Sequence, residues 1–322
     1  MKLKRTIIAV LSALSLTAAV ALTSCGSSDS SSKADSSSKA ADSTAAESKA
    51  DESKADAESK GESKADAESK GESKAEDNST SAEGDGSWQK ILDKGKLVLG
   101  LDATFKPMGF TDENDQVVGF DIDCAKEVCS RLGVQLETYG VNWETKEIDL
   151  DAGTIDCIWN GLSVSDERKK VMLMSEPYMQ NKMVFVVNND SPVQTLADLE
   201  GKTAAVQNGS TAQEILKASD VGKTMTLSEL QTNVEALNQL EMNMCDAVFL
   251  DSVVAEYEIA TSGKAFRVLE EGLEPEEYAI GFRLADKELC DKVYGTLKEM
   301  KADGKLAEIS TKWFGKDVTT VK

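Results

Sequence analysis

Short apolar runs alternate with helical patterns from residue 88 to residue 322. The runs predicted as strands are Lys96–Leu101, Val134–Val141, Asp156–Gly161, Met183–Asn188, Thr203–Gln207, Ala247–Asp251 and Tyr278–Phe282. The clearest helical pattern covers Asp121–Leu132, where the apolar residues share one face and Gly133 supplies a stop signal. This alternation of strands and helices predicts a parallel α/β architecture.

The length of this region favours two lobes over one doubly wound sheet. The chain composition around Val184–Val193 and Glu274–Ala279 suggests two crossings between the lobes. We therefore expect two doubly wound lobes joined by a two-strand hinge. Lobe one would comprise residues 88–184 and 275–322, and lobe two residues 185–274.

The first residues of the chain have the pattern of an export signal. A basic start, Met1–Arg5, precedes an apolar run from Thr6 to Leu22, which is too short to be a lasting membrane span. Leu22–Cys25 resembles the bacterial lipobox, which implies cleavage after residue 24 and lipid attachment to Cys25. The alternative is an ordinary signal peptide with an incidental cysteine. Either way, the mature protein works outside the membrane, and the lipid is the only anchor that we expect.

Residues 25–87 consist almost entirely of Ser, Ala, Lys, Asp, Glu and Gly. One decapeptide occurs at 52–61 and again at 62–71. A segment without large apolar residues cannot bury a core, and two short polar copies are too few for a solenoid. We expect a lipidated, disordered tether that holds the folded part away from the membrane surface.

Charge and composition exclude several classes of function. The chain has a net charge of −21 and no histidine. An acidic surface argues against nucleic-acid binding, and the lack of histidine removes the usual general base and metal ligand. We expect no metal and no cofactor. Five cysteines remain after Cys25, at positions 124, 129, 157, 245 and 290; they have no metal-like spacing, and one pair could still oxidise.

Three motifs in register carry a resemblance to a known family. They are Gly119–Asp123 at the start of the first clear helix, Asn160–Lys170, and Ser175–Tyr178. Together they resemble the polar amino acid family of solute-binding proteins that feed ABC importers, over about Leu97 to Gly315. The resemblance implies two hinged lobes with a ligand cleft between them, an amino acid as ligand, and a membrane permease as partner.

A free amino acid is a zwitterion, so its site needs a forked cation for the carboxylate and an acid for the ammonium. The resemblance places the carboxylate-binding arginine at Arg168. Ser165 is a good N-cap that would put Arg168 in the first turn of a helix. The alternative is a surface arginine paired with Asp166 or Glu167.

Lobe two supplies the predicted partners of Arg168. Ser210 and Thr211 open a helix after a strand, where Ser210 with Gln213, or Thr211 with Glu214, could form a capping box. A plain capped turn is the alternative for Ser210. By resemblance, Asp251 takes the ligand ammonium; the alternative is an N-cap for a helix that begins near Val253.

The remaining expected contacts surround the ligand's ammonium and side chain. By resemblance, Gly161 offers a carbonyl and Ser163 a hydroxyl to the ammonium, and Asn160 also belongs to the site. Phe105 and Trp143 would clamp the side chain between their rings, with core packing as the alternative for each. Asp102 and Gln207 would contact its polar tip, and the lack of a second cation disfavours glutamate and aspartate.

We therefore expect a monomeric, lipid-anchored receptor on the extracellular face of the membrane that delivers a polar amino acid to an ABC permease. Glutamine or cystine is favoured, with basic amino acids second, and the protein is expected not to be an enzyme. The alternatives are an exported dehydratase or lytic transglycosylase on the same fold, with Glu144 or Asp102 as the acid or base, and a ligand-sensing module.

Overall fold

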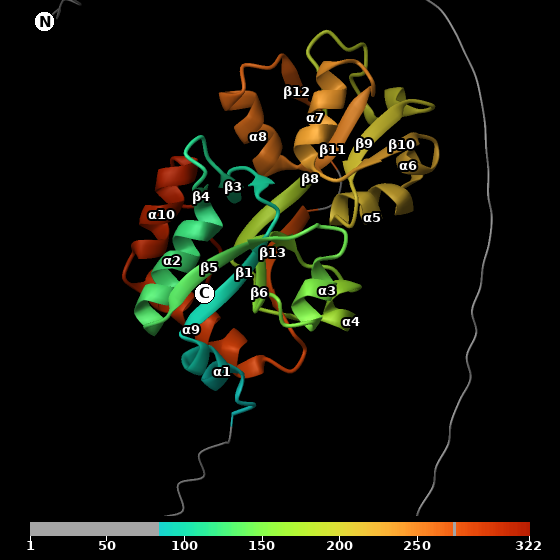
Figure 1. Ribbon diagram of the computed structural model, residues 1–322. Helices are drawn as coiled ribbons and strands as arrows, with labels where there is room; N and C mark the ends of the chain where they lie inside the picture. The colour runs from blue at the N-terminus through green and yellow to red at the C-terminus, as the bar shows by residue number, and fades with distance from the viewer. Residues whose placement is uncertain (1–83, 273–274) are drawn as a thin grey trace, which may run out of the picture. The chain divides into compact units, whose positions relative to one another are not determined.

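The computed structural model describes residues 84–272 and 275–322, in which helices pack against one large mixed sheet (Figure 1). The predicted signal peptide, Cys25 and most of the predicted tether therefore lie outside the described residues. Within the described part, no helix is long and apolar enough to cross a membrane.

The large mixed sheet has the strand order β10-β9-β11-β8-β13-β6-β1-β5. One end of the sheet, which we call lobe one, contains the parallel strands β1 (Lys96–Leu101), β5 (Gln135–Gly140) and β6 (Cys157–Ser163). The other end, lobe two, contains the parallel strands β9 (Thr203–Gln207), β10 (Thr226–Leu230) and β11 (Ala247–Asp251). Five of these six strands lie where the sequence predicts them, within two residues, whereas β10 was not predicted.

Two long strands join the lobes: β8 (Met179–Asn188) and β13 (Pro275–Phe282). They pair antiparallel with each other, and β8 also pairs antiparallel with β11, and β13 with β6. The parallel pairing predicted from the sequence thus holds within each lobe but not at the hinge. The reason is that the chain crosses from lobe one to lobe two along β8 and returns along β13. Both strands begin earlier than predicted.

Helices cover both faces of each half of the sheet (Figure 1). In lobe one, α1, α2, α9 and α10 pack on one side of the sheet, and α3 and α4 lie on the other. Their bounds are α1 (Ser87–Lys94), α2 (Phe120–Leu132), α3 (Lys146–Asp151), α4 (Arg168–Val171), α9 (Lys287–Ala302) and α10 (Lys305–Phe314). Lobe two has α5 (Thr211–Ala218), α6 (Asp220–Lys223), α7 (Asn233–Glu241), α8 (Ser252–Thr261) and the 3-10 helix η1 (Leu196–Leu199).

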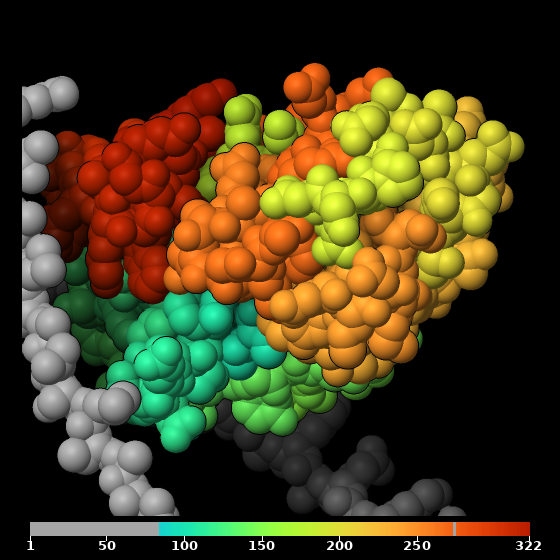
Figure 2. Space-filling view, turned by 90° about the horizontal axis from the view of Figure 1, so that it is seen from above, coloured from blue at the N-terminus to red at the C-terminus, as the bar shows by residue number. Residues whose placement is uncertain are grey.

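The sequence analysis missed the shorter strands, which have too few residues for a periodic signal. A separate three-stranded sheet consists of β2 (Thr104–Phe105), β3 (Gly109–Thr111) and β4 (Val117–Val118). The edge strands β7 (Leu173–Met174) and β12 (Phe266–Val268) pair with β13 and β8. Helix α7 of lobe two contacts β2, and Figure 2 shows orange residues of lobe two against teal residues of lobe one.

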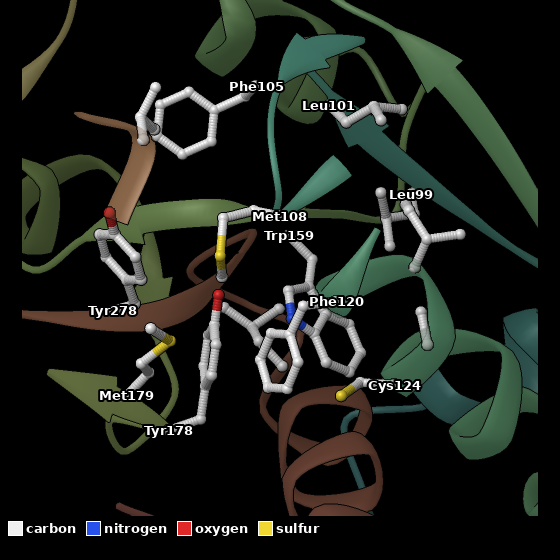
Figure 3. Packing of buried hydrophobic residues seen from close by; sticks show 14 of the residues in the cluster. Leu99, Leu101, Phe105, Met108, Phe120, Cys124, Trp159, Tyr178, Met179 and Tyr278 are labelled. Atoms are coloured by element: carbon white, nitrogen blue, oxygen red, sulfur yellow. The ribbon is translucent and has the colours of Figure 1, made fainter. Parts of the chain in front are cut away.

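The core beneath the hinge is aromatic. Tyr178 stacks on Phe120 at 6.4 Å between ring centroids and meets the edge of Trp159 at 6.2 Å (Figure 3). Its hydroxyl donates to Asp121, the third residue of the Gly119–Asp123 motif, and Asp121 also accepts from the amide of Gly161. This motif therefore fixes the backbone of β6 where the strand reaches the centre of the molecule.

All five described cysteines are buried and unpaired. Burial raises the pKa of Cys129 to about 12 and that of Cys245 to about 11. These thiols remain protonated at neutral pH and pack as small apolar groups.

Candidate functional site

Arg168 lies at the first residue of α4, directly after the loop that leaves β6. The hydroxyl of Ser165 accepts a hydrogen bond from the Arg168 amide at 3.2 Å, as expected of an N-cap. The guanidinium is buried and donates to the Ser163 carbonyl at 2.7 Å. The alternative of a surface arginine is wrong, because Asp166 and Glu167 pair with the exposed lysines that follow Arg168.

The same guanidinium reaches lobe two. It donates to the Thr211 hydroxyl at 3.3 Å and to the Gly209 carbonyl at 3.4 Å. Ser210 is the N-cap of α5: its hydroxyl accepts from the Gln213 amide and donates to the Gln207 carbonyl. The plain capped turn therefore describes Ser210, and Thr211 is the residue of this pair that contacts Arg168.

Gly209 brings the two lobes into close contact. Its φ of +66° favours glycine, and an added Cβ would lie 2.6 Å from the Cα of Glu144. Any side chain at residue 209 would push the start of α5 away from the loop before α3.

Lys146 is a buried cation beside this turn that the sequence analysis missed. Its Nζ donates to the carbonyls of Trp143 at 2.9 Å and Gly209 at 3.1 Å, and pairs with Glu147 at 2.9 Å. Burial, followed by the charge of Arg168, lowers the pKa of Lys146 to about 8. One signal was available: Lys146 lies four residues before the apolar Leu150, on the same face of α3.

Asp251 ends β11 at the hinge, and its side chain is buried. Its Oδ1 accepts from the Tyr278 hydroxyl at 2.6 Å and from the Asn181 amide at 2.7 Å. Asp251 occupies the N-cap position of α8, which begins at Ser252, but its side chain makes no capping bond. The capping alternative is therefore wrong for the carboxylate. Burial raises the pKa of Asp251 to about 6.

Glu276 of β13 is a second buried acid that the sequence analysis missed. Its Oε2 accepts from the Ser163 hydroxyl at 3.0 Å and from the Asn181 amide at 3.3 Å. Burial, followed by the charge of Asp251, raises the pKa of Glu276 to about 7. Because side chains alternate along a strand, Glu276 shares a face with the buried Tyr278, and this spacing is the signal in the sequence.

Asp102 and Gln207 join the lobes at a second place. The Asp102 Oδ2 accepts from the Gln207 side chain at 2.8 Å, and Oδ1 accepts from the hydroxyl and amide of Thr104. The Gln207 side-chain oxygen accepts from Asn233 at 3.1 Å. Asn160 acts on the backbone: its Oδ1 accepts from the Asp102 amide at 3.1 Å.

The two predicted clamping rings are both largely buried. Phe105 lies over Gly161, where an added Cβ would come within 2.7 Å of the ring. Trp143 packs in an apolar cluster that includes Val98 and Ile155, and the Lys146 Nζ lies 5.0 Å from the centroid of its ring. Core packing therefore describes Trp143, whereas Phe105 borders the strand that carries Ser163.

A hollow of about 530 Å³ is lined by residues that bond to Arg168 and Asp251, although not by these two residues themselves. Thr211, the partner of Arg168, lines it together with Asn181 and Glu276, the neighbours of Asp251. Glu276 thus lines the hollow directly, and Arg168 and Asp251 each bond to a residue that lines it. A forked cation with carboxyl groups nearby is the donor and acceptor set that a zwitterion requires.

Known proteins show the same architecture and sequence pattern. Residues 97–316 match the model of the bacterial extracellular solute-binding proteins, family 3. The L-cystine-binding protein TcyJ of Escherichia coli is 28% identical over 73% of this chain and 88% of its own. The arginine-binding extracellular protein ArtP of Bacillus subtilis is 30% identical over 69% of this chain and 87% of its own.

A solved structure adds the fold to this likeness. It is an ABC uptake transporter substrate-binding protein from Streptococcus pneumoniae with bound histidine. It is 37% identical, has a TM-score of 0.69, and covers 74% of this chain and 99% of its own. With the family model matched over most of the described residues, this chain belongs to family 3 of the bacterial extracellular solute-binding proteins.

Proposed function

We propose that this protein captures one polar amino acid between its lobes and delivers it to the permease of an ABC importer. The observation that carries the proposal is the position of Arg168. This buried guanidinium belongs to lobe one, contacts Thr211 and Gly209 of lobe two, and lies near the buried Asp251. The ligand carboxylate would bind Arg168, and the ligand ammonium would bind Asp251.

Closure of the lobes is the proposed mechanism. Arg168 and Asp102 of lobe one, and Thr211, Gln207 and Asp251 of lobe two, all reach the ligand only when the cleft is shut. A ligand that makes contacts in the closed state alone shifts the population toward that state. The continuous strands β8 and β13 are the proposed hinge, with lobe boundaries near residues 184 and 274.

Asp102 and Gln207 support a ligand with a neutral polar side chain. Asp102 offers acceptors, whereas the Gln207 amide both donates and accepts. A side chain with hydrogen-bond donors fits this end of the site, and a carboxylate would lie against Asp102 without a counter-charge. Glutamine or cystine is the proposed ligand, and the likeness to a cystine-binding protein agrees with it.

Basic amino acids are the second candidate, and one observation favours them. The Asp102 carboxylate is buried, and within the described residues its bonding partners are neutral. A cationic side chain would supply the missing positive charge. The likeness to an arginine-binding protein and to a histidine-bound structure supports this candidate.

The cellular setting belongs to the same proposal. We propose that lipid on Cys25 anchors the protein at the extracellular face of the membrane, that residues 25–87 form the tether, and that the protein acts as a monomer. Cys25→Ala should abolish labelling by radioactive palmitate in growing cells. Labelled variant protein would contradict the anchor but leave the receptor function untouched.

An enzymatic function has weaker support. Glu144, one candidate acid, is exposed at the surface, and Asp102, the other, is held by Thr104 and Gln207. The relatives named above are binding proteins. Incubation with prephenate-like acids and with peptidoglycan separates the classes, because a receptor leaves both unchanged.

A thermal-shift screen of the twenty amino acids, cystine and ornithine tests the proposed function. A ligand at 100 times its dissociation constant stabilises the folded state by about 2.7 kcal/mol, so a true ligand raises the melting temperature by several degrees. Glutamine or cystine should give the largest shift, and arginine, lysine, histidine or ornithine the next. No shift with any compound would contradict the receptor function.

A further inference from the structure

We infer that Glu276 is a second carboxylate of the ammonium site, and that Asp251 and Glu276 hold one proton between them until a ligand ammonium displaces it. This inference rests on the proposed function, because it concerns the group that binds the amino end of the ligand. It adds a specificity-determining residue and a proton that leaves when the ligand arrives.

The geometry places both acids around one amide. The Nδ2 of Asn181 donates to Asp251 Oδ1 at 2.7 Å and to Glu276 Oε2 at 3.3 Å. The Ser163 hydroxyl donates to the same Glu276 oxygen at 3.0 Å. Since that hydroxyl hydrogen is already donated, the remaining lone pairs of Ser163 can only accept.

Neighbouring strands of the sheet hold this cluster together. Glu276 pairs directly with Asn181 between β13 and β8, and Asp251 pairs with Met183 between β11 and β8. Ser163 pairs with Tyr278 between β6 and β13. None of these contacts depends on the Arg168 and Asp102 contacts across the cleft, so we expect the carboxyl pair to persist when the cleft opens.

The charges that face the pair do not balance two carboxylates. Arg168 is the cation that lies near them, and the Tyr278 hydroxyl donates to Asp251. Helix α5 contributes Glu214, a further acid that lines the hollow. Glu277, which follows Glu276, and Lys182, which follows Asn181, are both exposed.

One bound proton removes this excess negative charge. Two close, buried carboxylates disfavour each other's ionised form, so the pair retains a proton near neutral pH. The raised pKa values of Asp251, about 6, and Glu276, about 7, agree with this expectation. A ligand ammonium supplies the positive charge instead, and the proton of the pair then leaves to solvent.

The cluster also selects the form of the ligand's amino group. Asp251, Glu276 and the oxygen of Ser163 are three acceptors, and a primary ammonium has three N–H donors. An N-acetylated amino acid has one donor and no charge, and a trimethylated one has no donor. We expect both to be rejected, with monomethylation tolerated poorly.

Calorimetry of the wild-type protein tests the proton directly. The best amino acid from the screen is titrated at pH 6.5 in buffers of different ionisation enthalpy, and again at pH 9. After subtraction of the proton that the free ligand's own amino group takes up, the expected release is between about one half and one proton at pH 6.5, and near zero at pH 9. Release that is absent at pH 6.5, although the amino acid binds, would overturn the inference and leave the receptor function standing.

Glu276→Gln identifies the residue, and Glu277→Gln, the exposed neighbour, is the matched control. The glutamine at 276 cannot carry the charge that the ligand ammonium needs, so affinity should fall by about tenfold at pH 8. Near pH 5 the wild-type carboxyl is protonated as well, so the two proteins should bind almost equally. The control should match the wild type at both pH values.

Two results would contradict the role of Glu276. One is an equal loss of affinity at both pH values, and the other is wild-type proton release in Glu276→Gln. If this variant does not fold, the wild-type buffer series still decides the inference. Failure of every amino acid to bind the wild type would instead contradict the proposed function itself.

Discussion

Arg168 donates a hydrogen bond to the hydroxyl of Thr211, with 3.3 Å between Nη1 and Oγ1. The two residues belong to different lobes, and each lies at the first residue of a helix that follows a strand of its own lobe. The contact therefore forms only when the lobes approach each other. A carboxylate bound between them would replace part of this contact and hold the lobes together.

Arg168→Ala should weaken amino acid binding by roughly 30-fold to several thousand-fold, because removing one partner of a buried charge pair costs about 2–5 kcal/mol. Isothermal titration calorimetry measures the loss. Lys169→Ala, at the exposed next residue, is the control and should bind as the wild type does. A loss below threefold for Arg168→Ala would show that the carboxylate binds elsewhere.

Asp102→Asn should change the selectivity between ligand side chains, and it should leave the binding of the ligand's ammonium and carboxylate groups largely unchanged. The amide keeps the shape but loses the charge, so basic amino acids should lose about tenfold more affinity than glutamine does. Competition binding with the wild type provides the reference, in which glutamate and aspartate should compete poorly. If either acid displaces bound ligand better than glutamine, cystine, arginine and lysine, Asp102 does not contact the side chain.

The ligand-free protein should lose stability as the pH rises from about 4 to about 7. Burial raises the pKa of Asp121 and Glu276 to about 7 and that of Asp251 to about 6, from ordinary values of 3.8 or 4.5. A carboxyl group whose pKa is higher in the folded than in the unfolded protein stabilises the folded state at pH values below its unfolded pKa. This stabilisation is lost as the pH rises through its folded pKa.

Urea unfolding at pH 5 and pH 8 checks this dependence. The free energy of unfolding should be larger at pH 5, and Glu276→Gln should show a smaller difference between the two pH values than the wild type. A protein that is more stable at pH 8 would contradict the burial of these acids.

Lys146→Met should weaken ligand binding without removing a predicted ligand contact. The substitution keeps the apolar stem but removes the Lys146 donor from the Trp143 carbonyl and leaves the Gly209 carbonyl with Arg168 alone, which destabilises the closed state. We expect a loss of about tenfold in affinity, whereas Lys170→Met at the exposed surface should have no effect. Small-angle scattering should show a larger open fraction for Lys146→Met; wild-type closure and affinity would argue against this role.

Apart from β10 and the short edge strands β7 and β12, the sequence predicted the strands of the main sheet, because their apolar runs are long and bounded by turn residues. The family resemblance pointed to Arg168, Thr211 and Asp251, and Asp251 also ends a strand at the edge where α/β sheets bind ligands. Lys146 and Glu276 were missed for a common reason. A charged residue in an amphipathic element is usually exposed, and only the tertiary packing of the Gly209 turn and of Asn181 buries these two.

Contacts between elements that are distant in the sequence could not be predicted either. The Asp102–Gln207 hydrogen bond joins residues 105 positions apart, and nothing in the sequence around either residue specifies it. The same holds for Trp143, whose ring packs into the cluster beneath α3. Periodicity indicates which residues share the apolar face of an element. Whether such a side chain packs in the core or contacts the ligand depends on how the two lobes pack against each other.

The most direct test of carboxylate binding by Arg168 is a double-mutant cycle in which one change is made in the protein and the other in the ligand. The best amino acid and its methyl ester, which lacks the carboxylate charge, are titrated by calorimetry into the wild type and Arg168→Ala. If Arg168 binds the carboxylate, the ester should bind the wild type at least 30-fold more weakly than the free acid, and this difference should nearly vanish in Arg168→Ala. An ester penalty of the same size in both proteins would contradict the central role of Arg168.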